Sequence, residues 1–221
     1  MGTGVGGARG GRRRRRGRGV LGILVIIGAL VAVGLAVHQS MPGWYARIWY
    51  PLDHEAAINR DAARNGLDPA LVAAVTWRES GFDPMATSPK GAVGLMQVLP
   101  STARFIESQP APPPGRAIDI RDPEVNISYG TWYLRYLIDR HGGSVPAALA
   151  AYNAGPENMR RWREAAIARG TELRIPGDIP FPETRAYVTD VMDAWPIYRE
   201  AHGEALGAAT PPRSTGAPAS P

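Results

Sequence analysis

The sequence contains no cysteine and only four histidines, and this shortage excludes several kinds of site. Without cysteine no disulfide can form, and the thiolate ligands of most structural zinc sites are missing. The histidines do not have the spacing of metal ligands either. The sequence therefore offers no pattern of metal ligands.

Acidic residues are absent from residues 1–19, which hold seven arginines. Without these seven, the formal net charge of the chain changes from +5 to −2. The basic character therefore belongs to an N-terminal tail, and it does not describe the rest of the protein. Such a tail could bind nucleic acid, but the segment that follows it favours a different role.

Charged residues are also absent from residues 20–37, an uncharged run rich in apolar residues and glycine. Its 18 residues are close to the minimum for a membrane-spanning helix. Arginines before it predict a cytoplasmic N-terminus, with the rest of the chain in the periplasm on the far side of the inner membrane. The alternative is a cleaved signal peptide. Four aromatic residues follow this run and could form a belt at the membrane surface: Trp44, Tyr45, Trp49 and Tyr50.

No alternating strand pattern longer than four residues occurs, whereas helix signals are frequent. We expect a helical domain over residues 53–206, joined to the membrane segment by a linker at 38–52 and followed by a disordered tail at 207–221. A small β-hairpin near 83–97 stays an open alternative. The predicted helices cover residues 54–65 (capped by Asp53), 69–79, 101–107, 122–140, 144–152, 157–168 and 183–200.

One of these helices carries a glutamate on its apolar side. Asp68 and Pro69 have the pattern of an N-cap and a first helical residue. Glu79 follows Val72 by seven residues and Val75 by four, so it shares their face. Burial there should raise the pKa of its carboxyl group. A carboxyl group that keeps its proton near neutral pH can act as a general acid.

Glu79 also opens a longer pattern over residues 79–103, ES-x-F-x-P-x-A-x-S-x-x-GA-x-GLMQ-x-x-P-x-TA. Three further blocks follow it: DPEVNI at 122–127 with Gly130 and Tyr133-Leu134, AAYNAGP at 150–156, and IPFPETRAYV at 179–188. In kind and order these blocks resemble the lytic transglycosylases of the SLT-domain type, the lysozyme-like glycoside hydrolase family 23. The resemblance covers roughly residues 55–200.

The resemblance implies a mostly α, lysozyme-like fold of about seven helices. It also implies cleavage of the β-1,4 bond between N-acetylmuramic acid and N-acetylglucosamine in peptidoglycan. One glutamate, here Glu79, would protonate the glycosidic oxygen. The same residue would then deprotonate the muramyl C6 hydroxyl, closing a 1,6-anhydro ring without water, metal or cofactor. Asp83, the other acid of the first block, is better explained as a turn residue before Pro84.

Several other residues would bind substrate if the resemblance holds. Three of them also have a purely structural interpretation. Met96 could belong to the core, and Asn153 could stabilise a turn. Glu183 could be an acid in the first turn of a helix, where the helix dipole stabilises its charge. Ser88 and Tyr152 would contact the acetamido group or Glu79, while Tyr187 would share a helix face with Glu183. The full predicted set is Ser88, Gly94, Met96, Gln97, Tyr152, Asn153, Glu183 and Tyr187.

Two other functions stay open at this point. A lysozyme-type hydrolase would use the same Glu79 but admit water. A membrane-tethered scaffold would bind glycan without cutting it, as part of a protein complex of the cell envelope. The expected partners are thus peptidoglycan strands, the inner membrane and such a complex, not nucleic acid. Because cysteine is absent, the lipid anchor of some family members is excluded.

Overall fold

The computed structural model describes residues 2, 26–29, 43–113 and 119–207. The chain divides into two units, residues 1–45 and 46–221. Within the described ranges, no helix has both the length and the apolar character needed to cross a bilayer. The predicted span at residues 20–37 lies largely outside those ranges, as do the tail at 208–221 and nearly all of residues 1–19.

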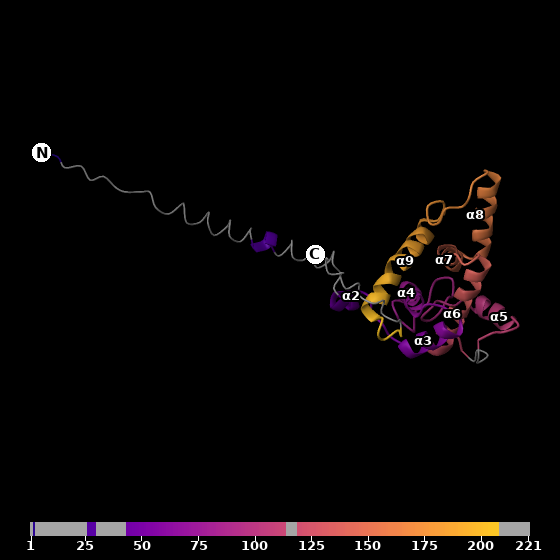
Figure 1. The fold of residues 1–221 in the computed structure, drawn as a ribbon, viewed down its shortest axis with the longest axis horizontal. Coiled ribbons are helices and arrows are strands. Elements are labelled where there is room, and N and C mark those ends of the chain that lie inside the picture. Colours follow the sequence, from indigo (N-terminus) through magenta and orange to yellow (C-terminus); the bar gives the residue numbers. More distant parts are fainter. Residues whose placement is uncertain (1, 3–25, 30–42, 114–118, 208–221) are drawn as a thin grey trace, which may run out of the picture. The chain divides into compact units, whose positions relative to one another are not determined.

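The expectation of a mostly helical domain is confirmed in the second unit (Figure 1). In the part of this unit that the structure describes, seven helices follow the helix α2 (Gly43–Trp49), which begins in the first unit. They are α3 (Glu55–Arg64), α4 (Pro69–Ser80), α5 (Pro100–Glu107), α6 (Pro123–Arg140), α7 (Val145–Ala154), α8 (Pro156–Ala168) and α9 (Pro182–His202).

Polar caps fix where several helices begin. The Asp68 carboxylate accepts a hydrogen bond from the Ala70 amide at the start of α4, and Asp122 and Ser144 cap α6 and α7 in the same way. The cap predicted for the first helix of the domain is wrong. α3 begins after His54, not Asp53, and His54 makes no side-chain cap.

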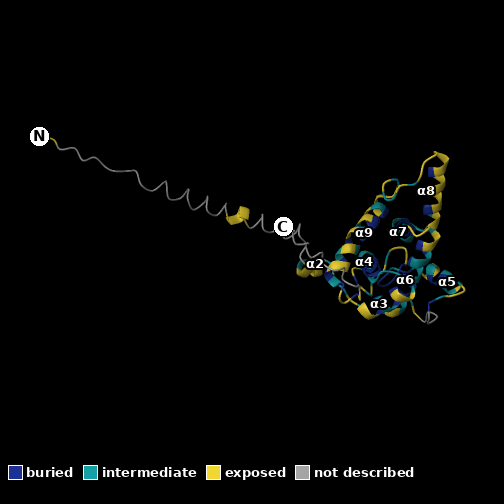
Figure 2. Cartoon of the chain, viewed as in Figure 1, coloured by how far each residue is buried: buried dark blue, intermediate teal, exposed yellow. Residues whose placement is uncertain are grey.

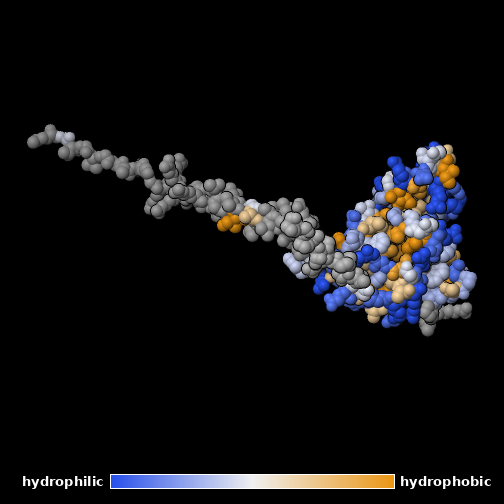
Figure 3. Space-filling view, in the orientation of Figure 1, coloured by the Kyte–Doolittle hydropathy of each residue, from blue (hydrophilic) through white to orange (hydrophobic). Residues whose placement is uncertain are grey.

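Helix α4 lies in the centre of the domain, and its residues 70–76 are all buried (Figure 2). It packs most extensively against α9. Two polar contacts hold the pair in register: Arg78 Nε donates to Asp190 Oδ2 at 2.8 Å, and Trp195 Nε1 donates to Asp68 Oδ2 at 2.7 Å. On the outside, hydrophilic groups cover much of the face seen in Figure 3, with apolar residues gathered between α8 and α9. Helix α4 is therefore a fixed support for the residue at its C-terminal end, Glu79.

The loop between α4 and α5 is compact but does not form a hairpin of two strands. It contains only isolated antiparallel bridges, from Val93 to Thr87 and to Val98. The buried side chain of Asn126, on α6, adds hydrogen bonds to this loop. Its Oδ1 accepts from the Met96 amide at 2.7 Å, and its Nδ2 donates to the Val93 carbonyl at 2.8 Å. The loop is thereby fastened to α6.

Candidate active site

Glu79 occupies the last turn of α4, where the apolar side of the helix meets the loop. Val72 and Val75, on the same face, are fully buried. Glu79 itself keeps partial exposure to solvent. A carboxyl group here has lost much of its hydration, yet part of the residue stays accessible from solvent.

Two side chains act on the Glu79 carboxyl group. Tyr187 of α9 donates a hydrogen bond from its hydroxyl group to Glu79 Oε1 at 2.6 Å. Arg78 lies over the Tyr187 ring, with its guanidinium carbon 5.6 Å from the ring centroid, and pairs with Asp190. The carboxyl group therefore has one direct donor and one nearby cation.

Burial has the largest influence on Glu79 and raises the pKa of its carboxyl group to about 7, while Tyr187 and Arg78 act in the opposite direction. This confirms the rise of the pKa expected from the helix pattern. A carboxyl group with this pKa is divided between its acid and its base form near neutral pH. It can therefore donate a proton in one step and accept one in the next.

Tyr152 and Asn153 come from the C-terminal end of α7. The Tyr152 hydroxyl group donates to the Met96 carbonyl at 2.8 Å. Burial and the nearby Glu79 carboxylate raise the pKa of Tyr152 well above its usual value. Asn153 Oδ1 accepts from the Thr184 hydroxyl group at 2.7 Å, which ties α7 to the start of α9. In this structure Tyr152 thus supports the loop beside Glu79 instead of contacting Glu79 directly.

The loop residues predicted to bind sugar have different surroundings. Gly94 adopts φ 76° and lies against Asn126; a Cβ atom there would be 2.5 Å from Asn126 Nδ2. Met96 is completely buried, so its alternative interpretation as a core residue describes it. Gln97 is partly exposed and donates to the Gly94 carbonyl at 3.0 Å. The Ser88 hydroxyl oxygen accepts from the Ala92 amide at 3.0 Å.

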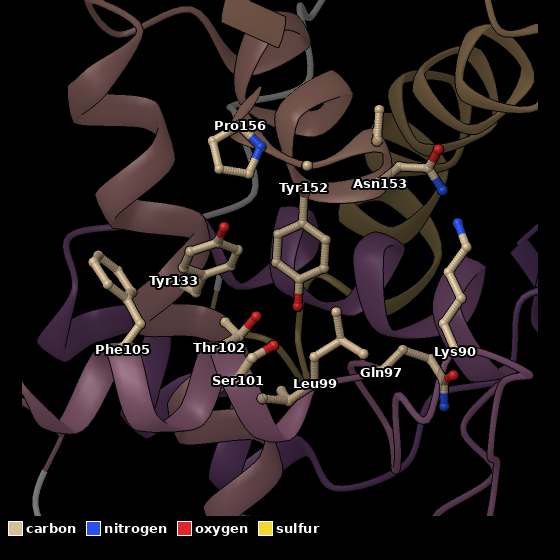
Figure 4. A pocket seen from close by; sticks show the side chains of 13 residues that line it. Lys90, Gln97, Leu99, Ser101, Thr102, Phe105, Tyr133, Tyr152, Asn153 and Pro156 are labelled. Carbon is tan, nitrogen blue, oxygen red and sulfur yellow. The ribbon is translucent and has the colours of Figure 1, made fainter. Parts of the chain in front are cut away.

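A cavity of about 380 Å³ lies beside these residues (Figure 4). Of the predicted site residues, it is lined by Gln97, Tyr152 and Asn153. Its remaining wall is formed mainly by the start of α5 and by Tyr133 of α6. The cavity combines aromatic rings, hydroxyl groups and amides, which suits a neutral polar ligand with apolar faces, such as a sugar.

The remaining predicted residues are not part of this cavity lining. Glu183 is exposed in the first turn of α9, in accordance with its alternative interpretation as a helix-start acid. Asp83 accepts from the Met85 amide at 2.8 Å, which confirms its turn role. Among the described residues, no group of three or more His, Cys, Asp or Glu could hold a metal ion.

Sequence reasoning missed most of the residues that line the cavity. Lys90, Phe105 and Tyr133 are three of them, and none was predicted as a site residue. Tyr133 and Lys90 could have been predicted from the sequence, since they lie within the second and the first motif block. Phe105 lies in no motif block, and its role depends on the packing of α5 beside α6, which the sequence does not show.

Comparison with known proteins agrees with the resemblance seen in the motif blocks. A family model described as the Transglycosylase SLT domain matches residues 56–175. The soluble lytic murein transglycosylase of Salmonella typhimurium is 34% identical over 180 residues, covering 77% of this chain and 27% of that protein. The membrane-bound lytic murein transglycosylase C of Edwardsiella ictaluri is 31% identical over 64% of this chain and 45% of that protein.

Solved structures agree with these sequence relatives. The lytic transglycosylase Slt of Pseudomonas aeruginosa, solved as an inactive mutant with a glutamate replaced by glutamine, superposes with a TM-score of 0.63 at 33% identity. That match covers 79% of this chain and 28% of the other. The chain thus spans about a quarter of the length of the first of these relatives. The matched domain, the motif blocks and the helical fold agree, and the chain belongs to the Transglycosylase SLT domain family.

Proposed function

We propose that this protein is a peptidoglycan lytic transglycosylase with Glu79 as its acid and base. The observation that carries the proposal is the desolvated Glu79 carboxyl group, with a pKa of about 7. Glu79 does not itself line the sugar-sized cavity, but its charge acts on Tyr152, which does. The relatives named above support it, since their names describe lytic transglycosylases of murein. The inactive glutamate-to-glutamine mutant of the Pseudomonas enzyme shows that one glutamate matters in that relative.

In the first step, protonated Glu79 donates its proton to the glycosidic oxygen between N-acetylmuramic acid and N-acetylglucosamine. The bond from the muramyl C1 atom to this oxygen breaks, and the N-acetylglucosamine portion leaves with a new hydroxyl group. The acetamido group of the substrate stabilises the positive charge at C1. In the second step, the Glu79 carboxylate takes the proton of the muramyl C6 hydroxyl group. The oxygen of that hydroxyl group then bonds to C1 and closes the 1,6-anhydro ring. Glu79 regains its proton, and no water is consumed.

The lysozyme-type hydrolase is the second candidate. A glycosidase of the usual kind needs two carboxyl groups, one on each side of the bond. In the described part of the chain, Tyr187 and Arg78 are the side chains that shift the pKa of Glu79, and no acid is among them. Asp190, the nearest acid named in this network, is already paired with Arg78. The support for ring closure over hydrolysis comes from the relatives, whose names describe lytic transglycosylases.

We further propose that the protein is anchored in the inner membrane by residues 20–37, with the domain in the periplasm. The arginines of residues 1–19 would set this orientation. The membrane-bound relative supports attachment to a membrane, and peptidoglycan would then be within reach. A complex with other proteins of the cell envelope would fit the same location.

Replacing Glu79 by glutamine tests the assignment. Glu79→Gln keeps the size of the side chain but removes the proton that must be transferred, so release of fragments from purified peptidoglycan should fall by about a thousandfold or more. Full activity in this variant would refute the role of Glu79.

The fold of the variant can be checked in the same preparation. Because Glu79 in the folded protein holds its proton up to a pKa of about 7, whereas the unfolded chain loses it near 4.5, stability falls as pH rises between these values. Glutamine has no proton to lose in this pH range, so the stability of the variant does not fall in this way. At pH 8 Glu79→Gln should therefore be more stable than the wild type by about 3 kcal/mol, and its unfolding temperature should be higher. Inactivity together with a lower unfolding temperature would indicate a damaged fold.

A further inference from the structure

Lys90 is held at the edge of the cavity by a tight turn. The Gly91 amide donates to the Ser88 carbonyl at 2.9 Å, which closes a turn with Pro89 and Lys90 at its centre. The Ser88 hydroxyl oxygen accepts from the Ala92 amide, and the Ser88 amide donates to the Ala92 carbonyl at 2.9 Å. Proline restricts the backbone of this turn further. The position from which the Lys90 side chain starts is therefore well defined.

From this turn the Lys90 side chain extends along one wall of the cavity toward Asn153 (Figure 4). Phe105 and Tyr133 form the opposite wall, and Tyr152 stands between the two. The ammonium group thus lies at one side of the space in which a sugar would bind.

Of the described residues that line this cavity, Lys90 is the only charged one. Among the described residues, no acidic side chain forms an ion pair with it. Other described cations of the domain, such as Arg104 and Arg121, also form no ion pair, so what distinguishes Lys90 is its place in the cavity lining. A cation held by a defined turn at a binding cavity, without an acid of its own, is suited to an anionic group of a ligand.

The chemistry of peptidoglycan identifies that group. The glycan chain consists of N-acetylated sugars and is uncharged, so its rings match the neutral aromatic and hydroxyl-lined wall. Negative charge on a glycan strand with peptides comes from the free carboxylates of the peptide stems, which are attached through the lactyl group of N-acetylmuramic acid. A stem that leaves the cavity past its edge would bring a carboxylate to Lys90.

We propose that Lys90 recognises a carboxylate of the peptide stem and makes the enzyme prefer strands that carry stems over bare strands. This inference rests on the proposed function and adds a substrate preference to it. An exposed ion pair of this kind contributes modestly, so the preference due to Lys90 should be about fivefold. It should weaken as salt is raised to about 0.5 M.

The experiment compares kcat/KM of the full chain, purified in mild detergent, on three forms of the same glycan strands. One form carries peptide stems, one has had its stems removed by an amidase, and one carries stems whose carboxylates are chemically amidated. The wild type should cleave the first form best, and Lys90→Met should lower the ratio between the first form and the other two by about fivefold. Lys90→Arg, which keeps the charge, should retain most of the ratio.

Arg104→Met is the matched control. Arg104 is also an exposed cation near the cavity, on α5, but it is not among the lining residues. Its loss should leave the substrate ratio as in the wild type. An unchanged ratio in Lys90→Met, or the same loss in Arg104→Met, would overturn the role of Lys90 while leaving the proposed function standing. Failure of the wild type to cleave any of the three forms would overturn the proposed function and this inference with it.

Discussion

At the scale of single residues, the acidity of Glu79 results from opposing influences. Burial at the end of α4 favours the protonated form, whereas the Tyr187 hydrogen bond and the Arg78 charge favour the carboxylate. Their balance gives a pKa of about 7. Since the proposed reaction needs both forms in turn, this balance is suited to it, and it can be altered by substitutions that leave Glu79 in place.

Tyr187→Phe should move the pH dependence of activity. It removes the hydrogen bond that lowers the pKa of Glu79, so the pKa rises above 7. Because the first step needs the protonated acid, activity of the wild type should fall above pH 7, and that fall should begin at a higher pH in Tyr187→Phe. The measurement is kcat/KM between pH 5 and 9 on purified peptidoglycan.

Tyr198→Phe provides the control for this prediction. Tyr198 is also a buried tyrosine of α9, but its hydroxyl group donates to the Pro51 carbonyl at 2.7 Å instead of to Glu79. Its removal should cost stability and leave the pH profile in place. If Tyr187→Phe lowers activity equally at every pH, the hydrogen bond does not set the acidity of Glu79.

The raised pKa of Glu79 could be predicted because its signal is local, whereas the catalytic role was suggested by the resemblance of the motif blocks. Val72, Val75 and Glu79 share a face through helix geometry alone, and the apolar partners predict burial. The donor to Glu79 is different, since Tyr187 lies 108 positions away in the chain. Its motif marked it as a site residue, but only the packing of α9 on α4 shows which group it contacts. The complete burial of Met96 depends in the same way on α6.

At the scale of structural elements, the loop between α4 and α5 is shaped by its contact with α6. Gly130 of α6 leaves room for Met96: a Cβ atom at this position would lie 2.5 Å from the Met96 Cβ atom. Thr131 and Asn126 contact the same residue of the loop. The Met96 carbonyl in turn accepts from Tyr152. Displacement of Met96 would therefore also disturb Tyr152, which lines the cavity.

Gly130→Ala should accordingly damage both stability and activity. The added methyl group must push Met96 and its loop away from α6, at a cost of about 1–3 kcal/mol in the free energy of unfolding. Denaturant unfolding and cleavage assays on the same protein measure both effects. Gly177→Ala is the control, because a Cβ atom there meets nothing within 4 Å and the residue has no left-handed φ. Wild-type stability in Gly130→Ala would contradict the close contact.

Helices were the part of the fold most accessible to sequence reasoning. Caps such as Asp68 and Ser144 fixed starts that the structure confirms. The hairpin near residues 83–97 is reduced to isolated bridges, and Asn126, far along the chain, adds hydrogen bonds that hold this loop. A contact with a distant side chain leaves no periodic pattern in the loop itself.

At the scale of the whole molecule, the distribution of charge predicts the location of the protein. Seven arginines precede an uncharged run at residues 20–37, whereas the rest of the chain is slightly acidic. An arginine-rich segment before an apolar one favours retention on the cytoplasmic side. The proposed activity requires the domain to lie on the opposite side, where peptidoglycan is found.

Cell fractionation tests this location. The full chain should remain in the membrane fraction after an alkaline carbonate wash and be released by detergent, because a spanning helix is held by the bilayer itself. Added protease should digest the domain in cells with a permeabilised outer membrane. Replacing Arg12 to Arg16 by alanine should weaken this orientation. A shorter, water-soluble periplasmic product lacking residues 20–37 would identify a cleaved signal peptide instead.

The most direct test of the proposed function is the mass of the fragments that the full chain releases from purified peptidoglycan. Ring closure by Glu79 predicts fragments that end in 1,6-anhydro-N-acetylmuramic acid, lighter by one water than the products of hydrolysis. The same fragments should be missing from digests with Glu79→Gln. Fragments that carry the additional water would contradict the lytic mechanism and identify a lysozyme-type hydrolase.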